Sequence, residues 1–149
     1  MHRTLSLAAL TLILAGCGGD STGPSTTANV GGAWTASITN LSGSGVSCFT
    51  SAFSVALSQT DNTFTGSYGA GTITCSGNGQ QLSENVPGGV IVNGTVSGDQ
   101  VAFDLDTQDA HQTGTISGNS MSGTSVWRLD LGAPTGVITL NGNWSAVRQ

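Results

Sequence analysis

Residues 89–129 read GVIVNGTVSGDQVAFDLDTQDAHQTGTISGNSMSGTSVWRL, and they contain two near-repeats, GTVSGD at 94–99 and GTISGN at 114–119. Each repeat ends in a Gly-Asp or Gly-Asn pair. Such pairs suit two-residue hairpin turns, because these residue types tolerate a positive φ. Apolar and polar residues alternate along both flanks of each pair. The stretch therefore predicts two β-hairpins, each with one buried and one solvated face.

The two predicted turns determine which residues face each other. In the second hairpin, Ile116 faces Met121 on the apolar side, and threonines and serines gather on the other side as a hydroxyl-rich outer wall. The polar side of the first hairpin pairs Asn93 with Asp104. Its apolar side holds three facing pairs: Val96 with Val101, Gly94 with Phe103, and Val92 with Leu105.

Turn signals at regular spacing extend this β pattern over most of the chain. We predict eight strands, over residues 32–40, 49–59, 63–74, 89–97, 100–106, 112–117, 120–129 and 137–147. Antiparallel strands joined mostly by short turns close most economically into an up-and-down barrel, which leaves no open edge. The predicted fold class is all-β, an eight-stranded antiparallel up-and-down barrel, with a β-sandwich as the alternative.

The beginning of the chain is typical of an export signal. His2 and Arg3 precede a mostly apolar run over 5–14, which is too short to cross a hydrocarbon core about 30 Å thick. The run ends in Leu14-Ala-Gly-Cys17, which resembles the lipobox of bacterial lipoproteins. The resemblance implies a signal peptide over 1–16, lipidation of Cys17 and a membrane anchor in the cell envelope. Because Gly18 rather than Asp follows the cysteine, it also implies the outer membrane in a host with two membranes.

Residues 18–29 are rich in Gly, Ser and Thr and contain no large apolar side chain. Such a segment buries too little surface to offset its ordering entropy. We therefore expect the lipidated cysteine and a flexible tether over 17–29, followed by a β-barrel domain over 30–149.

The two remaining cysteines lie on a third predicted hairpin. A turn at Asp61-Asn62 pairs Val55 with Tyr68 and, farther from the turn, Cys48 with Cys75. Exported proteins meet oxidising conditions, so we predict a Cys48–Cys75 disulfide. The chain-entropy model assigns such a cross-link about 3–4 kcal/mol of stabilisation.

Composition excludes several kinds of partner. Only 7% of the residues are charged, and the formal net charge is −5. After residue 16, the basic residues are Arg128 and Arg148 alone. No basic surface for nucleic acid is therefore expected, and the predicted membrane contact is the lipid anchor.

The ends of the predicted barrel resemble those of the calycins, which include lipocalins, avidins and fatty-acid-binding proteins. The resemblance rests on Gly32-Ala-Trp34 near the start and on Arg148 near the end. In calycins, a Gly-x-Trp on the first strand lies at the closed end, and an arginine from the last strand packs across the tryptophan ring. The resemblance implies that Trp34 and Arg148 close the barrel. Biotin binding is not expected, because Ala36 stands where avidins carry an asparagine.

No sequence motif points to catalysis. The chain lacks a Gly-x-Ser-x-Gly elbow, an HExxH motif and a Walker loop. The one acidic cluster, at 104–111, lacks the glycine and the closing glutamate of a calcium loop, and its residues alternate with apolar ones as on the solvated face of a strand. We predict no enzyme activity, no metal site and no cofactor.

Two non-enzymatic functions remain. In the first, a lipocalin-like lumen binds a small apolar ligand, segment 76–89 is a flap over the mouth, and the lining residues are Phe53, Phe64, Tyr68, Phe103, Met121 and Trp127. In the second, the domain is a structural or protein-interaction module of the cell envelope, and its lumen is packed solid. An open lumen of several hundred Å3, roughly, would favour the first function.

Overall fold

The computed structural model describes residues 27–77, 79–130 and 136–149. The predicted signal peptide, the Cys17 lipidation site and the predicted tether up to residue 26 lie outside this part of the chain. Among the described residues, no helix is long and apolar enough to cross a membrane.

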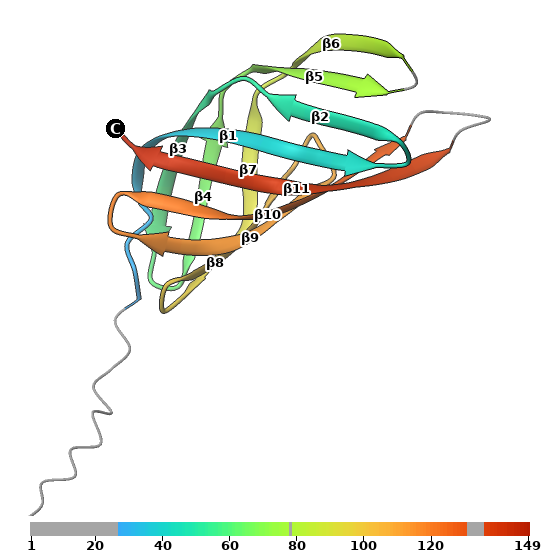
Figure 1. Ribbon diagram of the computed structural model, residues 1–149. Coiled ribbons are helices and arrows are strands. Elements are labelled where there is room, and N and C mark those ends of the chain that lie inside the picture. The colour runs from blue at the N-terminus through green and yellow to red at the C-terminus, as the bar shows by residue number, and fades with distance from the viewer. Residues whose placement is uncertain (1–26, 78, 131–135) are drawn as a thin grey trace, which may run out of the picture.

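The described residues form one antiparallel sheet that curls into a barrel (Figure 1). Its strands are β1 (Gly32–Gly43), β2 (Val46–Thr50), β3 (Phe53–Thr60), β4 (Thr63–Tyr68), β5 (Gly71–Gly77), β6 (Gln80–Val86), β7 (Gly89–Ser97), β8 (Gln100–Leu105), β9 (Ala110–Ser117), β10 (Ser120–Asp130) and β11 (Val137–Arg148). Eight of them close the barrel in the order β11-β10-β9-β8-β7-β4-β3-β1, because β1 also pairs with β11. This closure confirms the predicted fold class and excludes the sandwich.

The path of the chain is the predicted meander. Three of its long passes are each interrupted by a two-residue break, at 51–52, 69–70 and 87–88, so that each pass counts as two strands. The register is the same on both sides of the first two breaks. Val55 faces Tyr68 in the barrel, and Cys48 faces Cys75 beyond it. The Asp61-Asn62 turn therefore aligns the cysteines, and the predicted disulfide is present.

Above the breaks, β2, β5 and β6 form a three-stranded sheet that leaves the barrel wall (Figure 1). The prediction of a flap over 76–89 is wrong in this respect, because most of that segment is β6 and pairs along its length with β5. Nearly all of β6 is exposed, so no alternation of apolar and polar residues marks it as a strand. Pro87 and Gly88 separate it from β7.

The hairpin of β9 and β10 has the predicted register throughout, including Ile116 opposite Met121. Its outer face carries the predicted hydroxyl groups, and the hydroxyls of Thr113 and Thr124 lie 2.9 Å apart.

The hairpin of β7 and β8 departs from prediction halfway along. Val96 faces Val101 as expected, but an extra residue in β7 shifts the register between Val92 and Thr95. Asn93 lies at this bulge with a φ of 55°, a backbone conformation that asparagine tolerates well. The predicted pairing of Val92 with Leu105 is therefore wrong. Ile91 faces Leu105 instead and is buried, whereas Val92 lies on the outside.

Candidate ligand-binding cleft at the open end of the barrel

One end of the barrel is closed by Trp34, which is 1% exposed. Its indole N–H donates to the Val30 carbonyl over 2.9 Å, and the Arg148 guanidinium carbon lies 4.3 Å from its ring centroid. Arg148 also donates to the carbonyls of Asn29 and Gly31. Trp34 and Arg148, on which the calycin resemblance rests, thus lie against each other at this end, and their pairing follows from the β1–β11 register.

Gly32 is required beside this closure for two reasons. Its φ is +126°, which side-chain-bearing residues rarely adopt, and a Cβ there would lie 2.9 Å from an Arg148 nitrogen. Residues 27–29, which the sequence places at the end of the predicted tether, also hydrogen-bond to this end. Thr27 donates to Asn62, and the Ala28 N–H donates to the Gly98 carbonyl.

The lumen is packed with the chain's own side chains. Five of the six predicted lining residues are buried and Phe53 is partly buried. Aromatic rings meet edge to face, with centroids 5.8 Å apart for Phe64 and Phe103 and 5.2 Å apart for Phe103 and Trp144. Two voids between these side chains, among the described residues, have volumes of about 20 and 30 Å3. The predicted lining residues therefore fill the barrel, and the lumen has no room for a ligand of several atoms in this conformation.

Glycines on the inner faces leave space that the protein itself occupies. Gly114 and Gly123 face each other so closely that a Cβ on Gly123 would lie 2.4 Å from the Gly114 Cα. Trp144 pairs with Gly123 on the next strand, and its indole N–H donates to the Thr113 carbonyl over 3.0 Å. A tryptophan thus fills the space at this glycine pair.

Gln112 is the unusual residue of the lumen. It is 1% exposed and lines the 30 Å3 void, and neither its amide oxygen nor its amide nitrogen has a partner among the described residues. A void of this size is large enough for one water molecule, and a buried amide is costly without hydrogen bonds. Gln112 lies on the apolar side of the predicted hairpin, so its place in the alternation of residues was the signal that the sequence offered.

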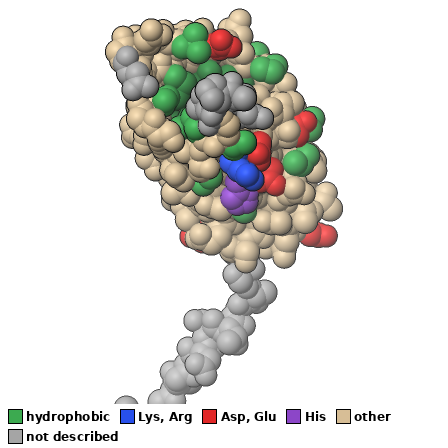
Figure 2. All heavy atoms as spheres, turned by 90° about the vertical axis from the view of Figure 1, so that its right-hand side faces the viewer, with side chains coloured by type: hydrophobic (Ala, Val, Ile, Leu, Met, Phe, Trp, Pro, Cys, Tyr) green, Lys and Arg blue, Asp and Glu red, His purple; other side chains and the backbone are tan. Residues whose placement is uncertain are grey.

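The large cavity lies above the lumen, at the open end. It is a cleft of about 550 Å3 between the β2-β5-β6 sheet and the ends of β10 and β11. The side of the sheet that faces it carries Val46, Ile73, Leu82 and the Cys48–Cys75 disulfide. Trp127, Leu129 and Ile138 line it from the barrel. Figure 2 shows the molecule from the right-hand side of Figure 1, and hydrophobic side chains gather in the upper part of that view.

The base of the cleft adjoins the upper of the two small voids. Val86, Gln108 and Trp127 line both spaces. Trp127 is held by its indole N–H, which donates to the buried Ser125 hydroxyl over 2.8 Å. Of the six predicted lining residues, Trp127 is thus the one that also faces the cleft, while the other five line or pack within the lumen.

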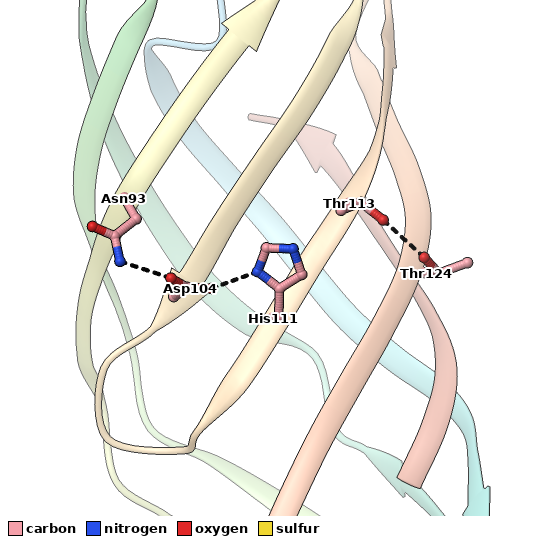
Figure 3. Close-up of polar contacts among 5 residues, drawn as sticks. All are labelled: Asn93, Asp104, His111, Thr113 and Thr124. Carbon is pink, nitrogen blue, oxygen red and sulfur yellow. Dashed lines mark hydrogen bonds and ion pairs between the residues drawn. The ribbon is translucent and has the colours of Figure 1, made fainter. Parts of the chain in front are cut away.

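A polar chain crosses the outside of the barrel on β7, β8 and β9 (Figure 3). The Asn93 amide donates to one Asp104 carboxylate oxygen over 2.7 Å, and a His111 ring nitrogen lies 2.6 Å from the other. Both contacts hold the pKa of Asp104 below its ordinary value, and the hydrogen bond from Asn93 has the larger effect. Partial burial of the carboxylate raises the pKa, but by less. The bulge at Asn93 aims its amide at Asp104.

This polar chain borders an open surface hollow of about 330 Å3, which Asp106, Asp109 and Arg128 also line. Asp109 and Arg128 lie 4.0 Å apart and are largely exposed. Within the described ranges, no three His, Cys, Asp or Glu side chains come together in a geometry that could hold a metal ion. The polar groups of this hollow are hydrogen-bonded or lie near Arg128, as expected for the solvated face of a strand.

Comparisons with protein families, with curated proteins and with solved structures find no match for this chain.

Proposed function

We propose that this protein is a lipid-anchored component of the bacterial cell envelope whose barrel binds a small apolar molecule in the open-end cleft, without catalysing a reaction. The observation that carries this proposal is the apolar lining of the cleft. Its volume of about 550 Å3 lies in the range typical of small-molecule sites. The site therefore differs from the lumen that the sequence indicated, because the lumen is filled.

The chemistry of the cleft favours an uncharged ligand. Glu84 is the one charged residue among the described residues that line it. An anionic group on the ligand would meet no opposite charge in the cleft, and burying an unpaired charge is costly. An apolar molecule gives up few hydrogen bonds with water when it enters the cleft. It also covers apolar side chains that are otherwise in contact with water.

The described chain starts at the end of the barrel opposite the cleft. The described chain begins at Thr27 on the closed end, where it hydrogen-bonds to Asn62 in the β3–β4 turn. A chain of about ten residues from Cys17 reaches at most about 35 Å. We infer that the closed end is held near the membrane and that the cleft opens away from it. The lipobox-like leader supports the anchor and the envelope location.

A second candidate function, a structural or protein-interaction module of the envelope, is favoured by the filled lumen. The two small voids show that the barrel is packed as a scaffold would be. This candidate predicts that small apolar molecules do not bind specifically.

Fluorescence titration with N-phenyl-1-naphthylamine, a neutral dye that brightens in apolar sites, separates the two functions. The protein would be the chain from residue 17 carrying Cys17→Ser. Ile73→Ser removes an apolar group from the cleft wall, and we expect it to weaken dye binding about fivefold. Val147→Ser, at an exposed valine on the barrel exterior, is the matched control and should leave binding unchanged. No saturable binding to the parent protein, or equal loss in both variants, would contradict the proposed function.

A further inference from the structure

The barrel wall has a gap beside β6. The last backbone hydrogen bond between the β7 and β8 passes in the described chain runs from the Asp106 N–H to the Val90 carbonyl, over 3.2 Å. Beyond this point, the same pass is formed by the residues that precede β7 in the chain, which are Gly88, Pro87 and then β6. There β6 pairs with β5 on one side, and on the other side it meets no strand of the described chain.

The gap exists because β8 ends early and its following loop is held aside. The Asp106 carboxylate accepts a 2.8 Å hydrogen bond from the Val90 N–H. The Thr107 hydroxyl is hydrogen-bonded to the Tyr68 hydroxyl. The chain then turns into β9, with the Gln108 N–H donating to the Leu105 carbonyl. The loop therefore cannot continue alongside β6, whose backbone edge borders the cleft.

Apart from the charge of Glu84, the free edge lacks the features that usually protect edge strands. β6 is seven residues long, QQLSENV, with no lysine and no proline. Its register with β5 is unbroken from Gly77 opposite Gln80 to Gly71 opposite Val86, so no bulge twists the edge away. Exposed edges of this kind present unpaired N–H and C=O groups on alternate residues, and an extended chain satisfies them.

We propose that β6 binds an extended polypeptide segment of a partner protein by β-strand addition in this gap. Alternate side chains of the added strand enter the cleft, next to Leu82 and Val86 of β6, and apolar residues suit these positions. The inference goes beyond binding of a small molecule, since the backbone edge of β6 recognises a polypeptide.

Charge specifies the chemistry of the partner further. Glu84 lies on β6 and lines the cleft, and within the described ranges it has no ion-pair partner. The whole chain carries a formal net charge of −5. An uncharged or basic segment is therefore favoured over an acidic one. The same charges oppose pairing of β6 with β6 of a second copy.

The test uses a synthetic peptide, acetyl-Lys-Val-Thr-Val-Thr-Val-Lys-amide with a fluorescent label, and the chain from residue 17 carrying Cys17→Ser. We expect saturable binding by fluorescence anisotropy, and slower amide hydrogen exchange in residues 80–86 with no change in β9 and β10. An analogue methylated on every backbone nitrogen should not bind, because it keeps the side chains but cannot donate the strand hydrogen bonds.

Two matched variants locate the site. Leu82 is 60% exposed on the cleft side of β6, and Phe49 is 54% exposed on β2 at a position outside the cleft lining. Since both side chains are mostly exposed, both variants should fold. Leu82→Ser should weaken peptide binding about fivefold, and Phe49→Ser should leave it unchanged.

Three outcomes would overturn the inference. The first is no peptide binding up to about 1 mM. The second is equal binding of the methylated analogue, which would show capture of side chains by the cleft and would leave the proposed small-molecule function standing. The third is a dimer of the protein alone, seen by analytical ultracentrifugation, with exchange protection in residues 80–86, because the edge would then be filled by a second copy. Dye binding without peptide binding would reject strand addition but not the proposed small-molecule function.

Discussion

The Arg148 guanidinium stacks over the Trp34 indole ring at the closed end of the barrel, with 4.3 Å between the guanidinium carbon and the ring centroid. The contact joins the first and last strands of the barrel, which pair directly at these two residues. Since Arg148 also donates to the carbonyls of Asn29 and Gly31, the same side chain fastens the segment that leads out of the barrel.

Arg148→Ala should destabilise the protein by about 2 kcal/mol, because it removes a cation–ring contact and charge-assisted hydrogen bonds to two backbone carbonyls. Urea unfolding followed by tryptophan fluorescence measures this change. Arg128→Ala is the matched control, since the Arg128 side chain is 62% exposed and lies 4.0 Å from Asp109. We expect the control to change stability by less than about 0.5 kcal/mol. Equal effects of the two variants would contradict the proposed role of Arg148.

The disulfide between Cys48 and Cys75 should stabilise the protein by about 3–4 kcal/mol, because it closes a loop of 27 residues' separation. Replacing both cysteines with alanine should lower the free energy of unfolding by this amount. The intact mass of the oxidised protein should also be lower than that of the reduced protein by two hydrogens. A stability loss below about 1 kcal/mol would show that the facing strands hold the sheet together without the bond.

Gln112→Leu should stabilise the protein by about 1 kcal/mol, because leucine has a similar size and removes a buried amide without partners. Gln112→Ala should instead destabilise it, since it adds a cavity to the 30 Å3 void. Chemical denaturation compares the two. Should leucine destabilise the protein strongly, the amide must have a bound partner such as ordered water.

The pKa of Asp104 should lie below the ordinary aspartate value of 3.8, mainly because the Asn93 amide and His111 hydrogen-bond to the ionised carboxylate. The resulting stabilisation is fully present above the pKa of the unfolded chain and is lost as the pH falls through the lower folded-state pKa. A carbon-13 NMR titration of the Asp104 carboxyl group measures this directly. Asn93→Ala should move the pKa towards the ordinary value, and an unchanged pKa would remove Asn93 as the principal cause.

Lipidation of Cys17 is tested by growing expressing cells with radioactive palmitate. The parent protein should carry the label and remain with the membranes, whereas Cys17→Ser should do neither. Cys48→Ser is the control for nonspecific labelling of cysteines. Label on Cys17→Ser, or its absence from the parent, would contradict the lipoprotein hypothesis.

Sequence reasoning succeeded where local turns determine the pairing. The Gly118-Asn119 turn aligns β9 with β10. The Asp61-Asn62 turn aligns the cysteines, although two-residue interruptions of the strands lie between the turn and the cysteines. It failed where neighbouring strands determine the conformation. The bulge at Asn93 adds one residue relative to both adjacent strands, which nothing in the local alternation of residues indicates.

The cleft was beyond prediction for a related reason. Its walls depend on β6, which is exposed and therefore lacks an apolar pattern. Its opening depends on the early end of β8 at Leu105. Of the residues predicted to bind a ligand, Trp127 alone lines the cleft, because the sequence distinguishes inward from outward positions but not a filled lumen from an open one.

The most direct test of small-molecule binding in the cleft is an NMR titration of the nitrogen-15-labelled chain from residue 17, carrying Cys17→Ser, with N-phenyl-1-naphthylamine. The proposed function predicts saturable shifts at cleft residues such as Ile73, Leu82 and Leu129, and at the Trp127 indole N–H, with little change around Trp34 at the closed end. Absence of saturable shifts, or shifts concentrated away from the cleft, would contradict the claim that this cleft is the binding site.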